Sequence, residues 1–421
     1  MTRTIHIVGL GVAGLSAAVR LAARGETLRL YEGAKVAGGR CRSFHDAKLD
    51  CLIDNGNHLL LSGNRSALSY LDLLGARDEL AIADTAHFPF VDLKSKERWS
   101  VTLNDGLIPW WALRKKTRIP GVKLSEFAPA LRLPFTGDNA TIAGITGTDG
   151  ALYDRFWEPM TWAVLNTTPE RASAMLMWNV FRETFAKGGT ACRPMIARRG
   201  LSETFVDPAL TYLAAKGIIP EYNRPLKDLT VENGRVSALH FSDESIDLAS
   251  DDMLLLALPR AAAARFVGEN RVPSGDACIV NAHFRLAEPL PRDSTPPLLG
   301  LLNAKTHWIF TRGDIVSLTI SAADALGLDR ISEDELLPDL WSEVTEALGL
   351  GGNYTYTAGR LIRERRATFD QSPESVALRP PFQGPHANMI LAGDWVNTKL
   401  PATIEGAVRS GELAAQEVRP H

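Results

Sequence analysis

Three glycines near the start of the chain have the spacing of a phosphate-binding turn. Residues 5–14 read IHIVGLGVAG, so an apolar run ends in Gly9, Gly11 and Gly14. The first glycine permits a tight turn, the second lets backbone approach a pyrophosphate, and the third lets a helix pack closely on a strand. If the helix starts at Val12 and Ala13, its free N–H groups face the pyrophosphate. The spacing predicts a dinucleotide-binding turn.

The elements that must position this turn follow in the right order. The apolar run predicts a strand, and apolar residues at helical spacing predict a helix that Gly25 ends. A second strand over residues 27–32 ends at Glu32. An acid about 20 residues beyond the glycines accepts a hydrogen bond from a ribose 2′-hydroxyl. The whole unit is therefore typical of a βαβ nucleotide-binding fold.

A second glycine pair beyond Glu32 indicates which dinucleotide is bound. Gly38 and Gly39 precede Arg40, and this segment resembles the second fingerprint of FAD-dependent amine oxidases and phytoene-desaturase-type enzymes. The resemblance implies that the glycines admit the phosphate and ribityl chain of FAD and that the arginine neutralises phosphate charge. It also implies backbone beside the isoalloxazine ring from Asn55, Gly56 and Asn57.

The C-terminal region supplies a third stretch. Gly393 and Asp394 end an apolar run, and a helix is predicted to open near Thr403 and Ile404. This resembles the third FAD motif of the same superfamily. The resemblance implies that Asp394 accepts hydrogen bonds from ribityl hydroxyls and that backbone N–H groups at Thr403 and Ile404 face the pyrimidine edge of the flavin. A helix N-terminus there would stabilise negative charge on the reduced ring.

The wording of residues 391–411, LAGDWVNTKLPATIEGAVRSG, resembles the hydroxysqualene dehydroxylases of bacterial hopanoid pathways, also called squalene-associated FAD-dependent desaturases. Residues 363–369 and 165–174 support the resemblance, and Lys399 departs from it where a small residue, often glycine, is expected. The implied reaction replaces the hydroxyl of hydroxysqualene by hydrogen, with reduced FAD as hydride donor. Because the hydroxyl is allylic, protonated C–O cleavage leaves a delocalised cation that can accept a hydride.

Candidate residues for this chemistry lie outside the cofactor stretches. His58 follows the expected flavin-facing segment and is the candidate general acid, since an imidazole can carry a proton near neutral pH. Aromatic residues are dense between positions 153 and 185 and predict an apolar tunnel for a long isoprenoid. The predicted substrate-binding residues are Phe156, Met160, Trp178 and Phe181.

Other functions remain open at this stage. A carotenoid or polyene desaturase would carry the same fingerprints and run the flavin oxidatively. An amine oxidase would need a polar cage in place of a long apolar tunnel. A non-catalytic flavoprotein that scaffolds isoprenoid synthases would bind FAD without substrate turnover. No second nucleotide fingerprint identifies the electron donor.

Composition narrows the remaining possibilities. The chain has 421 residues, 45% of them apolar, a net charge of −3 and four cysteines without metal-ligand spacing. We expect reduced thiols, no bound metal, no nucleic-acid partner and a cytoplasmic location. Paired tryptophans beside four basic residues make 107–118 a predicted contact with the inner face of the membrane, where squalene-synthase-like pathway partners are expected.

The predicted fold class is α/β. It combines a Rossmann-like FAD-binding domain, formed by residues 1–65, 200–268 and 380–421, with an inserted α+β substrate domain, formed by residues 66–199 and 269–379. The resemblance places Leu226 against the adenine. We expect residues 66–199 to be mostly helical, with one helix capped at Thr168 and closed at Gly188.

Overall fold

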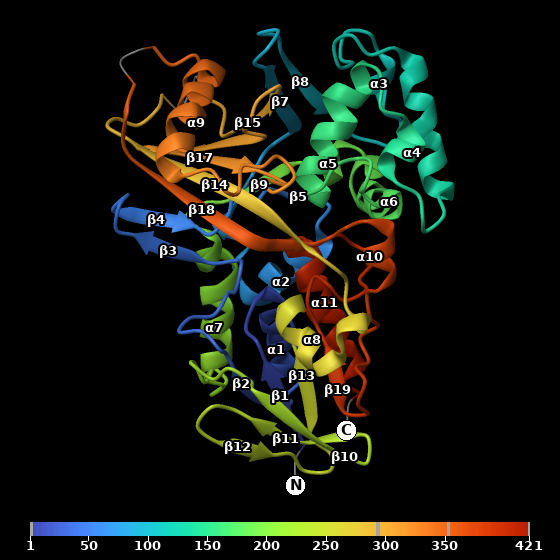
Figure 1. Ribbon diagram of the computed structural model, residues 1–421, viewed down its shortest axis with the longest axis vertical. Helices are drawn as coiled ribbons and strands as arrows, with labels where there is room; N and C mark the ends of the chain where they lie inside the picture. The colour runs from blue at the N-terminus through green and yellow to red at the C-terminus, as the bar shows by residue number, and fades with distance from the viewer. Residues whose placement is uncertain (1–2, 292–294, 352–353, 420–421) are drawn as a thin grey trace.

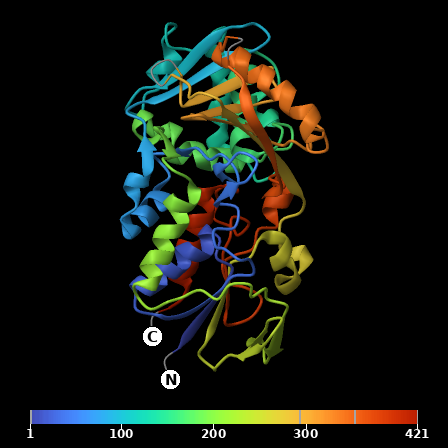
Figure 2. The ribbon, with the colours of Figure 1, turned by 90° about the vertical axis from the view of Figure 1, so that its left-hand side faces the viewer.

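The computed structural model describes residues 3–291, 295–351 and 354–419. The molecule is elongated, with a parallel sheet and its helices at one end and a larger mixed sheet at the other (Figures 1 and 2). The chain passes between the two ends several times, so both are built from segments far apart in sequence.

The parallel sheet has four strands that come from three separate stretches of chain. Its central strand pairs in parallel with a neighbour on each side. In sheet order the strands are β19 (Met389–Leu391), β13 (Met253–Leu256), β1 (Thr4–Val8) and β2 (Thr27–Tyr31). These strands are almost continuously apolar because both faces of the parallel sheet are buried.

Helices α1 (Val12–Ala23) and α11 (Ile404–Glu417) pack together beside this sheet. Their contact is so close that a side chain at Gly411 would lie 2.1 Å from the carbonyl oxygen of Ala13. Helices α2 (Arg65–Leu74) and α7 (Asp207–Ala214) pack on α11 and α1 respectively. Helix α7 follows the π-helical turn η6 (Ser202–Val206). A small antiparallel sheet lies at the end of the molecule: β10 (Asp228–Glu232), β11 (Arg235–His240) and β12 (Ser245–Asp247).

The larger sheet has seven strands, and only its β15–β7 pair is parallel. In sheet order they are β18 (Tyr356–Phe369), β14 (Asp276–Leu286), β17 (Ile315–Ile320), β16 (Trp308–Arg312), β15 (Leu298–Leu302), β7 (Ala86–Asp92) and β8 (Arg98–Leu103). Helix α9 (Glu333–Leu348) packs its leucines on one face of this sheet.

Short helical segments cover the other side of the mixed sheet and share a core with β7, β8 and β15. They are α3 (Trp110–Leu113), η2 (Leu124–Phe135), α4 (Ile142–Thr146), η3 (Tyr153–Trp157), α5 (Glu158–Leu165) and α6 (Ala174–Glu183). Small strands and helices connect the two ends: β3 (Ser43–Asp46), β4 (Cys51–Asp54), β5 (Leu60–Leu61), β6 (Leu80–Ile82), β9 (Pro194–Ala197), α8 (Arg260–Val267) and α10 (Pro373–Ala377). The remaining short helical turns are η1 (Arg77–Glu79), η4 (Phe185–Lys187), η5 (Gly189–Ala191) and η7 (Glu269–Arg271).

Two expectations for residues 66–199 are wrong. The stretch is not mostly helical throughout, because its hairpin β7–β8 forms the edge of the seven-stranded sheet through pairing with β15. The helix expected from Thr168 begins at Ala174, where the Ser173 hydroxyl accepts the N–H of Leu176, and ends at Glu183. Thr168 instead opens a turn that the N–H of Arg171 closes.

Candidate active site

The glycine turn after β1 has the shape that the sequence predicts. Gly9 has φ +98°, and a Cβ on Gly14 would lie 2.0 Å from the carbonyl oxygen of Gly9, so neither position accepts a side chain. A Cβ on Gly11 would meet only the carbonyl oxygen of Gly38, at 4.0 Å. Backbone at Gly11 therefore faces open space, directly before the first turn of α1, which begins at Val12.

The second glycine segment lies beside the first. Gly11 and Gly38 form an isolated parallel bridge, and the N–H of Gly38 donates to the carbonyl of Leu10 at 2.7 Å. Gly38 has φ +102° and Gly39 has φ +58°, which explains why glycine stands at both positions. Two stretches separated by more than twenty residues thus form one cradle at the end of β1.

Glu32 stands at the end of β2, where the predicted ribose contact belongs. In the structure its carboxylate accepts the N–H groups of Leu10, at 2.7 Å, and Ala34, at 2.9 Å. The side chain is therefore held in place and is half-buried beside the glycine turn. Leu226 is buried in the same part of the molecule, next to Pro225, which contacts Gly33.

Arg40 joins the second stretch to the third. Its guanidinium donates to Asp394 at 2.7 Å and to the carbonyl of Ala367. Burial lowers the pKa of Arg40, but the Asp394 carboxylate outweighs this and raises it overall. Gly393 has φ +142°, and a side chain there would collide with Trp395. The Arg40–Asp394 pair therefore brings the second and third cofactor stretches together.

The segment that follows β4 lies against the seven-stranded sheet. The amide of Asn57 donates to the carbonyl of Leu318 and to the hydroxyl of Thr319, both at 3.1 Å. The amide of Asn55 donates to Glu364, and Gly56 lies close to Asn281. These contacts fix the backbone from which His58 projects.

His58 lines an apolar cavity. Burial, with the nearby charge of Arg40, lowers its pKa to about 4. The imidazole is therefore neutral at pH 7, although the sequence predicts a group that can carry a proton near neutral pH. Within the described ranges, no hydrogen bond engages its ring, which leaves both ring nitrogens available.

The cavity, of about 260 Å³, lies between the parallel-sheet end and the mixed sheet. Aliphatic and aromatic side chains form most of its wall: Leu59, Leu60, Leu61, Phe88, Phe90, Val101, Phe156, Pro159, Met160, Ala163, Val164, Val180, Phe185, Ile279, Trp308 and Phe310. The continuous segment from Leu400 to Glu405 closes one end. The cavity therefore starts at the third cofactor stretch and extends among aromatic rings.

Two of the four predicted substrate residues line this cavity. Phe156 and Met160 lie on η3 and α5 at its wall. Trp178 and Phe181 do not line it, because α6 turns its Val180, Glu183 and Thr184 face toward the space. Phe181 instead packs on the rings of Phe156 and Trp157, at centroid distances of 6.0 and 5.5 Å.

The first turn of α11 is held from several sides. Thr403 caps the helix through its hydroxyl, which accepts the N–H of Gly406 at 3.1 Å. Buried Arg379 donates to the carbonyls of Leu400 and Asp394 and so fixes the loop before the helix. Lys399 in this loop has φ +64°, which explains why a glycine is expected there.

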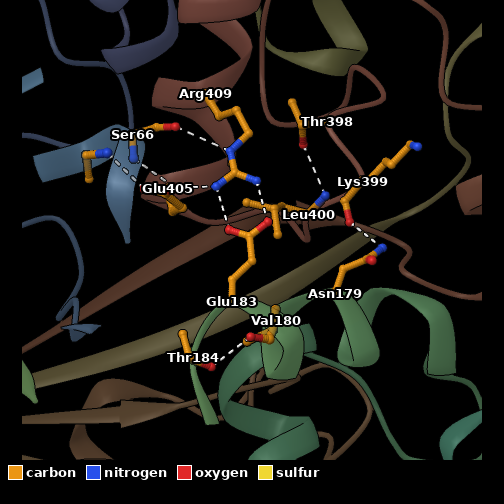
Figure 3. Close-up of polar contacts among 12 residues, drawn as sticks. Ser66, Asn179, Val180, Glu183, Thr184, Thr398, Lys399, Leu400, Glu405 and Arg409 are labelled. Atoms are coloured by element: carbon orange, nitrogen blue, oxygen red, sulfur yellow. Dashed lines mark hydrogen bonds and ion pairs between the residues drawn. The ribbon is translucent and has the colours of Figure 1, made fainter. Parts of the chain in front are cut away.

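Sequence reasoning missed a charged cluster at the same end of the cavity. Arg409 on α11 donates to both oxygens of Glu183 on α6 and to Glu405 one turn away (Figure 3). The spacing of Glu405 and Arg409 in the sequence, four residues apart in a predicted helix, could have indicated this pair. Nothing local points to Glu183, which is 226 residues away.

These positions fit FAD. Three separate stretches converge, a bare glycine backbone faces open space at the N-terminus of α1, and a cavity begins where the third stretch ends. Within residues 3–291, 295–351 and 354–419, no group of three or more His, Cys, Asp or Glu side chains could hold a metal ion. In the same ranges, no helix has the length and apolar character needed to cross a membrane.

Comparisons with known proteins agree with this site. A sequence model of the family described as "Flavin containing amine oxidoreductase" matches residues 12–419. Proteins named hydroxysqualene dehydroxylase from Rhodopseudomonas palustris and Sinorhizobium fredii are each 40% identical, over 99% of this chain and 99% and 98% of theirs. A probable zeta-carotene desaturase from Synechococcus elongatus is 21% identical over 98% of both chains.

Solved structures with the same fold include cyclohexylamine oxidase from Brevibacterium oxydans, with a TM-score of 0.71, 13% identity and coverage of 99% of this chain and 98% of that one. Putrescine oxidase superposes with a TM-score of 0.70 at 14% identity over 99% of both chains. The predicted fold class is thereby confirmed. This chain belongs to the flavin containing amine oxidoreductase family and, within it, to the hydroxysqualene dehydroxylases.

Proposed function

We propose that this enzyme uses reduced FAD to replace the allylic hydroxyl of hydroxysqualene by hydrogen, releasing squalene and water in hopanoid or triterpenoid biosynthesis. The observation that carries the proposal is an apolar cavity that starts at residues 400–405, in the third cofactor stretch, and continues between aromatic side chains. The names of the full-length relatives support the choice of substrate. In this proposal, residues 1–65, 200–268 and 380–421 hold the cofactor, and residues 66–199 and 269–379 form the substrate domain.

The reaction needs a hydride, a proton and an environment without water. When bound, reduced FAD supplies the hydride. The cavity wall excludes water, which would otherwise recapture the allylic cation. The faces of Phe156 and Phe310, both in that wall, stabilise the delocalised positive charge through their ring electrons.

The leaving hydroxyl takes its proton from His58 in this mechanism. His58 is the sole imidazole among the cavity-lining residues in the described part of the chain, and the lining carboxylates Glu183 and Glu405 are tied to Arg409. Because its pKa is about 4, a protonated His58 is a strong acid but a rare one at pH 7. We expect kcat/KM to rise as the pH falls toward 5, and His58→Ala to lose at least about tenfold in turnover while keeping FAD.

The direct test mixes photoreduced protein with hydroxysqualene under anaerobic conditions. Return of the oxidised flavin spectrum with stoichiometric squalene supports the proposal, and squalene itself serves as the control that must leave the flavin reduced. A polyene desaturase would instead reduce oxidised flavin with a carotenoid precursor. A scaffold would bind FAD and leave its spectrum unchanged with either compound.

We also propose that the enzyme takes this lipid from the cytoplasmic face of a membrane, near squalene-synthase-like partners. Seven of the fourteen large apolar side chains that are exposed in the described part of the chain lie within residues 107–135. They are Leu107, Ile108, Trp110, Leu113, Leu124, Leu131 and Phe135. The same 29 residues hold six basic side chains and one acid, Glu126, whereas the whole chain is slightly acidic. Such a surface suits anionic lipid headgroups above an apolar layer.

The proposed membrane-binding surface, residues 107–135, includes the helical segment η2 in addition to the predicted segment 107–118. Trp111 connects it to the cavity, because its ring lies 6.0 Å from Phe127 and 6.3 Å from the cavity-lining Phe156. We expect co-sedimentation with phosphatidylglycerol vesicles at low salt and little with phosphatidylcholine. Replacing Trp110, Leu131 and Phe135 together by serine should weaken binding at least about tenfold. Serine at the exposed Ile219 and Val231 is the matched control and should leave binding unchanged.

A further inference from the structure

Three charged side chains form a network at the end of the cavity that residues 400–405 close. The guanidinium of Arg409 donates to the two oxygens of Glu183 at 2.7 and 2.6 Å and to Glu405 at 2.7 Å (Figure 3). Its Nε donates to the hydroxyl of Ser66 at 3.3 Å. The side chains of Glu183, Arg409 and Glu405 are 20%, 18% and 5% exposed, so solvent screens their charges poorly.

Glu405 also has a second set of hydrogen-bond partners, which lie on a different helix. Its two oxygens accept the backbone N–H groups of Ser66, at 3.0 Å, and Ala67, at 2.8 Å, in the first turn of α2. Asn64, at the N-cap of α2, makes no side-chain capping bond, so Glu405 fills that role from another helix. The carboxylate thus serves α2, although it lies in the first turn of α11.

The charges of this network are closely balanced. Two carboxylates and one guanidinium leave a net charge of −1, and the N-termini of α2 and α11 each carry about half a positive charge. Burial raises the pKa of Glu183, but Arg409 outweighs it and lowers the pKa overall, so Glu183 is ionised. Removal of any one of the three charges changes the net charge of the network by one unit.

The network lies at the cofactor end of the cavity. Glu183 and Glu405 themselves line the cavity, together with Thr403 and Ile404 at the start of α11. The opposite face of α11 packs on α1, whose N-terminus follows the glycine cradle. A dinucleotide that starts at this cradle and passes the Arg40–Asp394 pair brings its redox ring to this end of the cavity.

We propose that Glu183, Arg409 and Glu405 act as positioning residues that set the reduction potential of the bound flavin through their net charge. The inference rests on the proposed FAD-dependent function and adds the residues that tune it. Reduction gives the flavin ring negative charge at neutral pH, so a nearby negative charge disfavours reduction and a positive one favours it. The native net charge of −1 keeps the reduction potential low enough for the reduced ring to donate a hydride readily. The positive charge of Arg409 prevents a larger free-energy cost of reducing the flavin.

The test is a charge series measured in the FAD-bound protein by anaerobic dye equilibration. Glu183→Gln removes one negative charge and should raise the potential, with the reduced-to-oxidised ratio at a fixed potential increasing by about tenfold. Arg409→Gln removes the positive charge and should shift that ratio by about tenfold in the opposite direction. The double variant Glu183→Gln with Arg409→Gln has the native net charge and should return close to the native potential.

The double variant separates charge from geometry, because it loses every Arg409 contact and yet keeps the native charge. If the network is only structural, the double variant will deviate at least as far as either single variant, and that result overturns the proposal. Shifts of the same sign in both single variants, or none, overturn it as well. If Arg409→Gln does not fold, Glu183→Gln and Arg409→Lys remain, and the lysine variant must keep the native potential.

A matched control lies at the far end of the molecule. Arg3 and Glu26 form a comparably buried pair, with side chains 8% and 13% exposed. Arg3→Gln and Glu26→Gln should lower stability and leave the potential unchanged. Because the reduction potential is measured without substrate, this inference and the proposed reaction can be refuted separately. If the wild-type protein converts hydroxysqualene but the potentials do not depend on charge, only this inference is refuted. If the potentials depend on charge but hydroxysqualene is not converted, only the proposed reaction is refuted.

Discussion

The cofactor cradle and the cavity wall are built by different means. The cradle is backbone: a side chain at Gly9, Gly14 or Gly38 would collide with neighbouring atoms, and Gly11 presents bare backbone to open space. The wall consists of side chains from the seven-stranded sheet, β5, η3, α5, α6 and the loop before α11. A substitution in the cradle acts through backbone geometry at once, whereas the wall can adjust around a single change. The contrast predicts at which positions a substitution is tolerated. It also predicts whether a substitution lowers stability, FAD affinity or the apparent affinity for substrate.

The sharpest test of this contrast is a pair of alanine substitutions inside the cradle. In Gly14→Ala the new Cβ lies 2.0 Å from the carbonyl oxygen of Gly9, so strand and helix must separate. We expect at least about 3 kcal/mol of lost stability and little folded protein. In Gly11→Ala the nearest atom is 4.0 Å away and φ is −66°, so the protein should fold normally.

Gly11→Ala should nevertheless lose FAD affinity by at least about tenfold, since its methyl group points where a pyrophosphate approaches the backbone. Thermal denaturation of the apoprotein and fluorescence titration with FAD measure the two effects. Native FAD affinity in Gly11→Ala would refute the assignment of the cradle.

The wall is tested by two large-to-small substitutions of similar chemistry. Phe156 is 8% exposed, lines the cavity and contacts the rings of Trp157, Phe181 and Phe185. Phe156→Ala should cost about 3 kcal/mol of stability and raise KM for hydroxysqualene about tenfold. Trp178→Ala, outside the cavity, should change KM less than about twofold. Chemical denaturation and steady-state kinetics give both numbers, and equal changes in KM would contradict the division of the aromatic cluster.

The same contrast explains what the sequence could predict. The cradle, the strand ends at Glu32 and Asp394 and the start of α11 follow from local patterns, because glycine, strand and cap signals depend on a few neighbouring residues. The convergence of the three cofactor stretches came from family resemblance and agrees with the Arg40–Asp394 pair.

The composition of the cavity wall could not be predicted from local sequence patterns in the same way. Hairpin β7–β8 joins a sheet whose other strands lie about two hundred residues later, so its pairing has no local signal. Phe181 lies within α6 and does not line the cavity, whereas Phe185 lies in η4, beyond the end of α6, and does line it. The Glu183–Arg409 pair joins two helices that are remote in sequence. Long-range packing decided each case.

The mixed sheet holds a buried histidine, His283, whose ring lies 2.8 Å from the hydroxyl of Ser317 in an apolar interior. Burial, with Arg312 nearby, lowers the pKa of His283 to about 4, below its value of 6.5 in the unfolded chain. Between these values the unfolded state binds more protons, so stability is full above pH 6.5 and falls as the pH drops toward 4. The loss from this residue should reach up to about 3 kcal/mol. Urea midpoints from pH 7 to 4 should fall less steeply in His283→Gln, and an unchanged slope would exclude this origin.

The smallest effect is expected at Lys399, in the loop that leads to the cavity-lining segment from Leu400. This residue has φ +64°, its carbonyl accepts the Asn179 amide at 2.9 Å, and its N–H reaches Asn397. A left-handed conformation costs a side-chain-bearing residue about 1 kcal/mol, and glycine removes that cost while adding a similar entropy to the unfolded chain. Lys399→Gly should therefore change the free energy of unfolding by less than about 0.5 kcal/mol. Lys399→Val should lose about 1 to 2 kcal/mol, because a β-branched side chain tolerates this conformation poorly. If glycine and valine behave alike in chemical denaturation, the backbone conformation at Lys399 does not limit the stability of this loop.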